Sequence, residues 1–254
     1  MNREQNKKYM VVIMAGGLGS RMKSLIPKVI HKINNKPMLA HIIEKANLLQ
    51  PEKILIVVGK YKKMIQQALQ SHINMKDSKI EWVNQPVANG TGDAVKCCIP
   101  HFKKFPTHKV LILSGDVPLI QSSMIKSIVD NVDKARVVVT KTDDPKGLGR
   151  IIIDHSTHRF IKIKEDKDCS EIERKINIVN TGVYVFRSYL LLQYLDYIKN
   201  TNAQQEYYIT DMIEILIKHE KDIEIDVYHV SDKDTYQFMG INTQEQLKQA
   251  QLLC

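Results

Sequence analysis

The stretch between residues 10 and 28 constrains the fold more than any other part of the chain. The apolar run Met10 to Met14 is typical of a buried strand, and three glycines follow it closely: Gly16, Gly17 and Gly19. Glycine lets the backbone turn sharply and leaves its amide groups bare, and such a turn can hold phosphate oxygens. The pattern therefore predicts a phosphate-binding loop at the end of a buried strand.

Two common glycine fingerprints do not fit this loop. The dinucleotide-binding pattern would need a glycine where Met22 stands, and the P-loop would need Gly-Lys-Ser/Thr from Arg21 to Lys23. The loop is followed instead by two cations, Arg21 and, behind Pro27, Lys28. A glycine turn alone is equally consistent with a plain connection between a strand and a helix, but the pair of cations favours phosphate binding.

Composition argues against several classes of protein. The 254 residues are enough for one large α/β domain or two small ones, and 43% apolar and 26% charged residues are ordinary for a soluble globular protein. The net charge of +9 attracts small polyanions. Because the lysines are scattered and no aromatic residues alternate with them, no nucleic-acid partner is predicted.

Cysteine spacing and hydropathy indicate the compartment. The four cysteines show neither a metal-binding pair nor a disulfide framework, so they are expected to be reduced. No apolar run approaches the length of a membrane span or a signal core. We therefore expect a cytoplasmic protein that does not associate with a membrane.

Strands and helices alternate along the first half of the chain. Apolar spacing predicts strands at residues 10–14, 54–58, 80–84 and 109–114, and helices at 38–49, 60–70 and 91–98, the last of them capped by Thr91. Strands joined in this order form a parallel sheet through right-handed crossovers, and ligands gather at the carboxyl ends of its strands. The predicted fold class is α/β.

The second half mixes shorter strands with helices. A helix is predicted at 121–130, and strands are predicted at 136–140, 151–153, 160–164, 176–186 and 223–230. Further helices are predicted at 188–197, 207–220 and 243–252. Since no linker separates the halves, we expect one domain, 1–254, made of a first half of about residues 1–120, a smaller β-rich lobe within about 121–242, and a C-terminal helix within 243–254.

Three polar segments interrupt this regular pattern. Residues 85–93 follow a strand and could read the edge of a planar base, although a capped loop is the simpler interpretation of the segment alone. Asp116 stands at the tip of a central strand beside Gly115, where a carboxylate is a candidate Mg²⁺ ligand, although an aspartate there, taken alone, is more often a turn residue or helix cap. Asn180-Thr181-Gly182 interrupts an otherwise strand-like run, which is unexpected unless something binds against it.

Taken together, these segments resemble one family. The chain resembles the uridyltransferase domain of the N-acetylglucosamine-1-phosphate uridyltransferases, within the wider family of sugar-nucleotide pyrophosphorylases, and the likeness runs from Met10 to Asn242. The glycine loop with Arg21 and Pro27-Lys28 marks the wider family. The branch is marked by Gly90-Thr91-Gly92, by Gly115 to Leu119 and, most specifically, by Asn202 to Asp211.

The resemblance implies a Rossmann-like mixed, mostly parallel sheet flanked by helices, the nucleotide-diphospho-sugar transferase fold. It implies a nucleotide-binding half, about 1–120, and a sugar-binding half, about 121–242. The implied nucleotide-binding residues are Met14, Ala15, Gly16, Gly17, Gln85, Gly90 and Thr91, the last three at uracil. The implied catalytic residues are Arg21, Lys28 and Asp116; Asp116 and Asn242 would hold Mg²⁺, and Gly149, Glu165 and Asn180 would contact the amino sugar.

The implied reaction converts UTP and N-acetylglucosamine 1-phosphate into UDP-N-acetylglucosamine and pyrophosphate. The second pKa of a sugar phosphate is near ~6, so the attacking oxygen is already ionised and needs no general base. The obstacle is repulsion between two polyanions, which arginine, lysine and Mg²⁺ reduce. We therefore expect no catalytic His, Ser or Cys. A UTP- or dTTP-dependent glucose-1-phosphate nucleotidyltransferase and a non-catalytic sugar-nucleotide-binding subunit remain open alternatives.

The chain departs from the family pattern at two points. Ser114 occupies a position where members of this branch often carry an aromatic residue. The bifunctional members also continue into a left-handed β-helix with acetyltransferase activity, whereas this chain ends at Cys254. We therefore expect neither that second activity nor trimerisation, and the protein is expected to be a monomer or a dimer.

Overall fold

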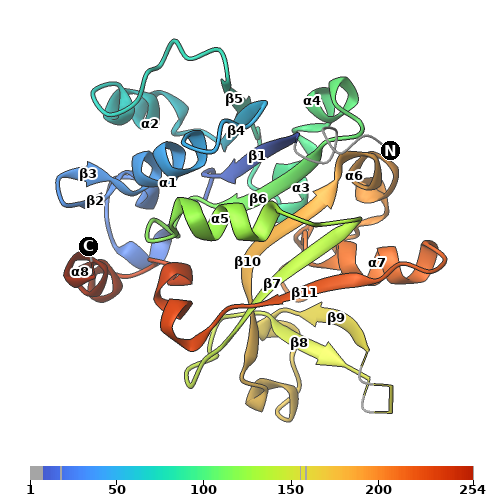
Figure 1. The fold of residues 1–254 in the computed structure, drawn as a ribbon. Helices are drawn as coiled ribbons and strands as arrows, with labels where there is room; N and C mark the ends of the chain where they lie inside the picture. The colour runs from blue at the N-terminus through green and yellow to red at the C-terminus, as the bar shows by residue number, and fades with distance from the viewer. Residues whose placement is uncertain (1–7, 18, 155, 158, 254) are drawn as a thin grey trace.

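A computed structural model describes residues 8–17, 19–154, 156–157 and 159–253. Its central sheet has the strand order β11-β7-β10-β6-β1-β4-β5, and β8 and β9 form an antiparallel pair joined to β10 (Figure 1). The strands are β1 (Tyr9–Met14), β4 (Lys53–Val58), β5 (Ile80–Asn84), β6 (Lys109–Ser114), β7 (Ala135–Lys141), β8 (Arg150–Ile153), β9 (Phe160–Lys164), β10 (Ile178–Arg187) and β11 (Ile225–His229).

Along the path from β11 to β5, four of the six neighbouring pairs are parallel. Strands β6, β1, β4 and β5 run in one direction, β10 runs against both β6 and β7, and β11 is parallel to β7. The predicted mixed, mostly parallel sheet is therefore confirmed. A short hairpin, β2 (Lys32–Ile33) and β3 (Lys36–Pro37), was not predicted because two-residue strands leave no periodic signal.

Helices cover both faces of the sheet (Figure 1). One face packs against α1 (Met38–Asn47), α2 (Lys62–Leu69) and α5 (Ser122–Val129), and the other against α3 (Thr91–Lys96), α4 (Ile99–Lys104), α6 (Ser188–Tyr194) and α7 (Asp211–His219). In β1, Val11 and Ile13 face the first group while Met10 and Val12 face the second, and all four are fully buried. Burial on both faces explains why this strand is a continuous apolar run.

The register brings the ends of the parallel strands to one edge. Met14 at the end of β1 pairs with Ser114 at the end of β6 and with Val57 on β4, and Val58 pairs with Asn84 at the end of β5. The glycine loop, residues 85–93 and the Gly115 turn therefore start from the same edge of the sheet. This is the edge at which an open α/β sheet binds its ligands.

Three predictions about the helices need correction. The helix predicted at 207–220 begins only at Asp211, because the carbonyl of Tyr207 accepts from Gly92 N instead of from Asp211 N. Thr91 does not cap α3: the N-cap position is Gly90, and the Thr91 hydroxyl accepts a hydrogen bond from Ile209 N. Finally, α4 was missed, although its Pro100 lies in the first turn, where a helix tolerates proline.

The last helix, α8 (Gln244–Leu252), lies within one residue of the predicted start. Thr243 and Gln246 form a capping box at its first turn. Leu247 and Ala250 pack with Ile33 and Met38 in a small core of their own, and this core also contains Ile241. The packing holds the preceding residues 240–242 against the edge of the sheet.

Lys109 predicts a pH dependence of stability. Its side chain at the start of β6 is almost fully buried, and Nζ donates to the carbonyl of Val129 at the end of α5 at 2.8 Å. Burial, reinforced by the nearby Arg187 charge, lowers the pKa of Lys109 from 10.5 to about 8. Between these two values the unfolded chain binds more protons than the folded protein, so stability should rise with pH, by at most about 3 kcal/mol.

The comparison that tests this is between the wild type and Lys109→Met. Urea denaturation at neutral pH and at about pH 10 should show a gain in unfolding free energy that the variant lacks. Parallel pH profiles for the two proteins would contradict the assignment.

Candidate active site

The turn after β6 places Asp116 next to the glycine loop. Gly115 N donates to the carbonyl of Met14 at 2.9 Å, and a Cβ at Gly115 would lie 2.9 Å from that same oxygen. Only glycine therefore lets the two strand ends approach this closely. The carbonyl of Asp116 in turn accepts a hydrogen bond from Ile241 N at 2.9 Å, which brings Asn242 to the same place.

Four predicted residues meet beside this turn. Lys28 Nζ forms an ion pair with Asp116 Oδ2 and donates to Asn242 Oδ1 at 2.9 Å. Arg21 Nη2 donates to the same Asn242 oxygen at 3.0 Å. The side chains of Lys28 and Asp116 are only 16% and 9% exposed, whereas Arg21 is exposed. The structure thus brings Arg21, Lys28, Asp116 and Asn242 into one cluster.

Asp116 is held in its charged form. Burial by itself would raise the pKa of this carboxyl, but the Lys28 ammonium and the Ser114 hydroxyl outweigh burial and keep the pKa below its usual value. Ser114 Oγ donates to Asp116 Oδ1 at 2.6 Å, so the two carboxylate oxygens have separate partners. The residue that departs from the family pattern therefore orients the carboxylate and leaves Oδ2 facing Lys28.

The cluster fits a hard divalent cation. Asp116 Oδ2 and Asn242 Oδ1 lie close enough together to contact one nitrogen, Lys28 Nζ, so they are also close enough to ligate one metal ion in its place. Among the residues that the structure describes, no group of three or more His, Cys, Asp or Glu side chains could form a complete cage. Two protein oxygens, completed by water and substrate phosphates, are the usual arrangement for Mg²⁺.

Residues 85–93, here called the base loop after their predicted role, are held in place from inside by Gln85. This side chain is buried, and its Nε2 donates to Gly90 O at 3.2 Å and to Asp93 Oδ2 at 2.8 Å. Because both neighbours of Nε2 are acceptors, the orientation of the amide is settled by the network. Its Oε1 lies 3.2 Å from the Cβ position of Gly16, so Gln85 joins the base loop to the glycine loop.

The bridging segment, residues 202–211, packs directly on the base loop. Gly90 has a φ of +105°, and a Cβ there would lie 2.5 Å from the carbonyl of Tyr207. Gly90→Ala should therefore lower the unfolding free energy by about 1–3 kcal/mol. Gly147→Ala is the matched control, since Gly147 also has a positive φ of +77° but nothing lies near its Cβ position. Equal losses in the two variants, measured by denaturant titration, would show that the contact with Tyr207 is unimportant.

The predicted sugar residues Gly149, Glu165 and Asn180 form a second cluster, here called the sugar cluster after that prediction. Asn180 N donates to the carbonyl of Gly149 at 2.8 Å, and the Asn180 side chain contacts the Tyr184 hydroxyl and Gly182 N. Glu165 Oε1 lies 3.6 Å from the Cβ position of Gly149. The pairing of β10 with β7 is irregular between Asn180 and Tyr184, which explains the polar residues in an otherwise apolar strand.

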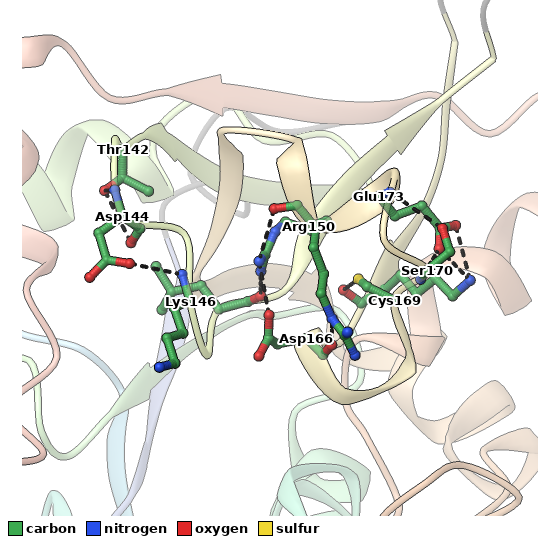
Figure 2. A network of polar contacts seen from close by, with 11 residues as sticks. Thr142, Asp144, Lys146, Arg150, Asp166, Cys169, Ser170 and Glu173 are labelled. Atoms are coloured by element: carbon green, nitrogen blue, oxygen red, sulfur yellow. Dashed lines mark hydrogen bonds and ion pairs between the residues drawn. The ribbon is translucent and has the colours of Figure 1, made fainter.

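A buried arginine supports this second cluster (Figure 2). Arg150 is 1% exposed; its guanidinium donates to the carbonyl of Leu148 and, at 2.8 Å, to Asp166 Oδ1. It therefore ties the turn that carries Gly149 to the turn that carries Glu165. Lys164 and Glu173 form an ion pair at 2.7 Å on the same lobe. Beside Glu165 there is an open cavity of about 340 Å³, which Tyr208, Asp211 and Asn202 also line.

Comparison with known proteins identifies the family. A family model described as nucleotidyl transferase matches residues 10–232, which is most of the chain. The chain belongs to the nucleotidyl transferase family. It is 40% identical over 245 residues to an Acanthamoeba polyphaga mimivirus protein named "Probable UDP-N-acetylglucosamine pyrophosphorylase", and the match covers 95% of this chain and 94% of the relative.

A second relative and one solved structure are also similar to this chain. The Bifunctional protein GlmU of Nitrosomonas eutropha is 36% identical over 239 residues, and this chain spans only about half (50%) of its length. A Bacillus anthracis structure described as a glucose-1-phosphate thymidylyltransferase superposes with a TM-score of 0.70 at 20% identity, covering 96% of this chain and 94% of that one. At that identity the superposition supports the fold and no more.

Sequence reasoning missed three side chains of this nucleotidyl transferase that hold the predicted ones in place. Asp93 orients Gln85, Thr210 donates to Glu165 Oε1 at 3.1 Å, and Arg150 joins the turns of the sugar cluster. Asp93 and Thr210 lie inside the polar segments 85–93 and 202–211, which the sequence pattern does single out. The partner of Thr210 lies 45 residues away, so spacing carried no signal for that contact, whereas Asp93 and its partner Gln85 lie within one segment.

None of the helices among the described residues is long and apolar enough to cross a membrane.

Proposed function

We propose that this nucleotidyl transferase makes UDP-N-acetylglucosamine and pyrophosphate from UTP and N-acetylglucosamine 1-phosphate. One observation supports this proposal above the others. At the edge of the sheet where the glycine loop begins, four side chains lie in contact: Arg21, Lys28, Asp116 and Asn242. The choice of substrates draws on the mimivirus relative, whose name states this activity and whose whole length this chain nearly covers.

The triphosphate is proposed to bind between the glycine loop and the two cations. The bare amides at Gly16 and Gly17 suit phosphate oxygens, and the Met14 and Ala15 backbone forms the start of the loop. The Ala15 amide donates to Val57 O at 2.8 Å, so this start is rigid. Arg21 is exposed and able to reach a ligand, while Lys28 is held in place by Asp116 and Asn242.

Asp116 and Asn242 would hold a Mg²⁺ ion. When bound, such an ion supplies positive charge where negative charge accumulates on the transferring α-phosphate. The side chains of this protein do the remaining work: Lys28 and Arg21 reduce the repulsion between the two anions, and the loop amides keep the α-phosphorus in line with the attacking oxygen. That oxygen is already ionised at neutral pH, so no proton has to be removed by the protein.

Gln85 is proposed to choose the base. With Nε2 committed to Gly90 and Asp93, its Oε1 is the atom left to accept a hydrogen bond from a ligand. Uracil carries an N–H donor on its pairing edge and cytosine an acceptor at the same position, so a fixed acceptor favours uracil. Gly90 and Thr91 supply the backbone that borders the base. Thymine has the same pairing edge as uracil, so dTTP is included among the nucleotides of the substrate test below.

The second cluster is proposed to bind the amino sugar. Glu165 and Asn180 offer polar atoms to sugar hydroxyl and amide groups, and Gly149 leaves room for close approach. On this proposal residues 1–120 are the nucleotide-binding half, 121–242 the sugar-binding half and 243–254 the C-terminal helix of one domain. The reaction would take place in the cytoplasm.

A substrate matrix tests the proposal. Four nucleoside triphosphates, dTTP among them, are combined with N-acetylglucosamine 1-phosphate or glucose 1-phosphate, with Mg²⁺ or EDTA, and pyrophosphate release is measured. The proposal predicts the highest kcat/KM for UTP with N-acetylglucosamine 1-phosphate and no release in EDTA. A preference for glucose 1-phosphate would identify the alternative transferase, and binding of nucleotide without release of pyrophosphate would identify a non-catalytic subunit.

A further inference from the structure

The bridging segment, residues 202–211, touches the base loop at three backbone positions. Tyr207 N donates to Asn89 O at 2.8 Å, and Gly92 N donates to the carbonyl of Tyr207 at 2.7 Å. Two residues after Tyr207, Ile209 N donates to the Thr91 hydroxyl at 3.0 Å. Three hydrogen bonds therefore join the base loop to residues 207–209.

The same segment also touches the sugar cluster. Thr210 Oγ1 donates to Glu165 Oε1 at 3.1 Å, and Ala203 N donates to Asp168 Oδ1 at 2.9 Å. Thr210 is 2% exposed, so its hydroxyl has little access to water as an alternative partner. A single peptide unit separates Thr210 from Ile209, which is bonded to the base loop.

The position of Glu165 depends on this contact. Oε1, the oxygen that accepts from Thr210, is also the one nearest the Gly149 turn. Burial raises the pKa of Glu165, because the surroundings stabilise the charged carboxylate poorly. The hydrogen bond from the Thr210 hydroxyl acts in the opposite direction and stabilises the charge. Without that donor, the carboxylate would lose both its orientation and a charge-assisted hydrogen bond.

We propose that Thr210 is a positioning residue for Glu165, and that the bridging segment couples the sugar cluster to the base loop. A nucleotide that orders the base loop also fixes residues 207–210, and thereby holds Glu165 ready for the sugar. By linkage, a bound sugar strengthens nucleotide binding by the same factor. The inference rests on the proposed function, because it assigns Glu165 to the sugar and the base loop to the nucleotide.

The coupling is measurable with two stable ligands. UDP fills only the nucleotide pocket, whereas UDP-N-acetylglucosamine fills both, so the ratio of their dissociation constants reports the contribution of the sugar. Isothermal titration of wild type and Thr210→Val should show that the variant binds UDP normally and that its ratio falls roughly tenfold, as expected for loss of one hydrogen bond to a charged group. Thr210→Ser, which keeps the hydroxyl, should restore most of the ratio.

Thr91→Val separates coupling from direct contact. If Thr91 only touches the base, the variant weakens both ligands equally and the ratio stays constant, which would overturn the coupling. The proposal predicts instead that the ratio falls in Thr91→Val, and that the double variant with Thr210→Val loses less than the two single losses combined. Thr107→Val, an exposed position before β6 at the opposite edge of the sheet, is the matched control.

The outcomes separate a failure of the proposed function from a failure of the positioning role of Thr210. A wild-type ratio near unity contradicts the proposed function itself, because the sugar would then add no affinity. A large wild-type ratio that persists in Thr210→Val, with normal UDP binding as proof of folding, contradicts the positioning role alone.

Discussion

Replacing Asp116 with asparagine is expected to lower kcat by roughly 10³-fold, since a charged group at the reacting phosphate is lost. Asparagine keeps the shape of the side chain and can still contact Ser114, so the fold should survive. The substitution leaves Lys28 without its anionic partner and removes one of the two oxygens proposed to hold Mg²⁺. The loss should therefore appear in kcat and in the Mg²⁺ dependence more than in the binding of UDP.

Steady-state pyrophosphate release across a Mg²⁺ titration measures this effect. Asp143→Asn, the same change at an exposed position, serves as the control and should retain wild-type rates. Circular dichroism confirms folding of both variants. A kcat for Asp116→Asn within a few-fold of wild type would rule out the metal assignment.

Lys28→Met is expected to damage both turnover and stability. The ammonium contacts Asp116 and Asn242 in a largely buried place, so its removal leaves a buried carboxylate without its cationic partner. Breaking such a pair costs on the order of 3 kcal/mol. Turnover should fall by roughly 10²–10³-fold as well, because one of the two cations that offset the phosphate charge is lost.

A double variant separates the two effects. Lys28→Met combined with Asp116→Asn removes both charges, so most of the lost stability should return while turnover stays low. Arg21→Met should lose turnover with little change in stability, because Arg21 is exposed. Denaturant titration and kinetics on the same preparations provide the comparison. If the double variant is no more stable than Lys28→Met, the buried charge pair does not explain the loss.

The sequence was sufficient to predict the fold class and the location of the charged cluster. The apolar run at Met10 to Met14 indicates a strand buried on both faces, and parallel strands bring their carboxyl ends together. Arg21, Lys28 and Asp116 could therefore be expected at one edge of the sheet from the order of strands and loops alone. Asn242 could be placed there only through the family resemblance.

The start of α7 and the role of Thr91 could not be predicted, because both depend on contacts between segments that are distant in the sequence. The start of α7 was predicted too early, because Tyr207 and Ile209 are apolar residues next to a helical pattern. In the structure the Tyr207 carbonyl, which a longer helix would need, accepts from Gly92 N in the base loop. Thr91 looks like a helix cap from its neighbours alone, yet its hydroxyl is used by Ile209, which is distant in the sequence. Tertiary hydrogen bonds overrode local propensity at both positions.

Phosphorus NMR provides the most direct test of the central claim that the Lys28 and Asp116 cluster directs attack to the α-phosphorus of UTP. The purified protein is mixed with UTP, N-acetylglucosamine 1-phosphate and Mg²⁺, and the phosphorus species are followed in time. We expect UDP-N-acetylglucosamine and pyrophosphate to accumulate in equal amounts, and both to form roughly 10³-fold more slowly in Asp116→Asn. Formation of UDP with inorganic phosphate, or an unchanged spectrum, would contradict that claim.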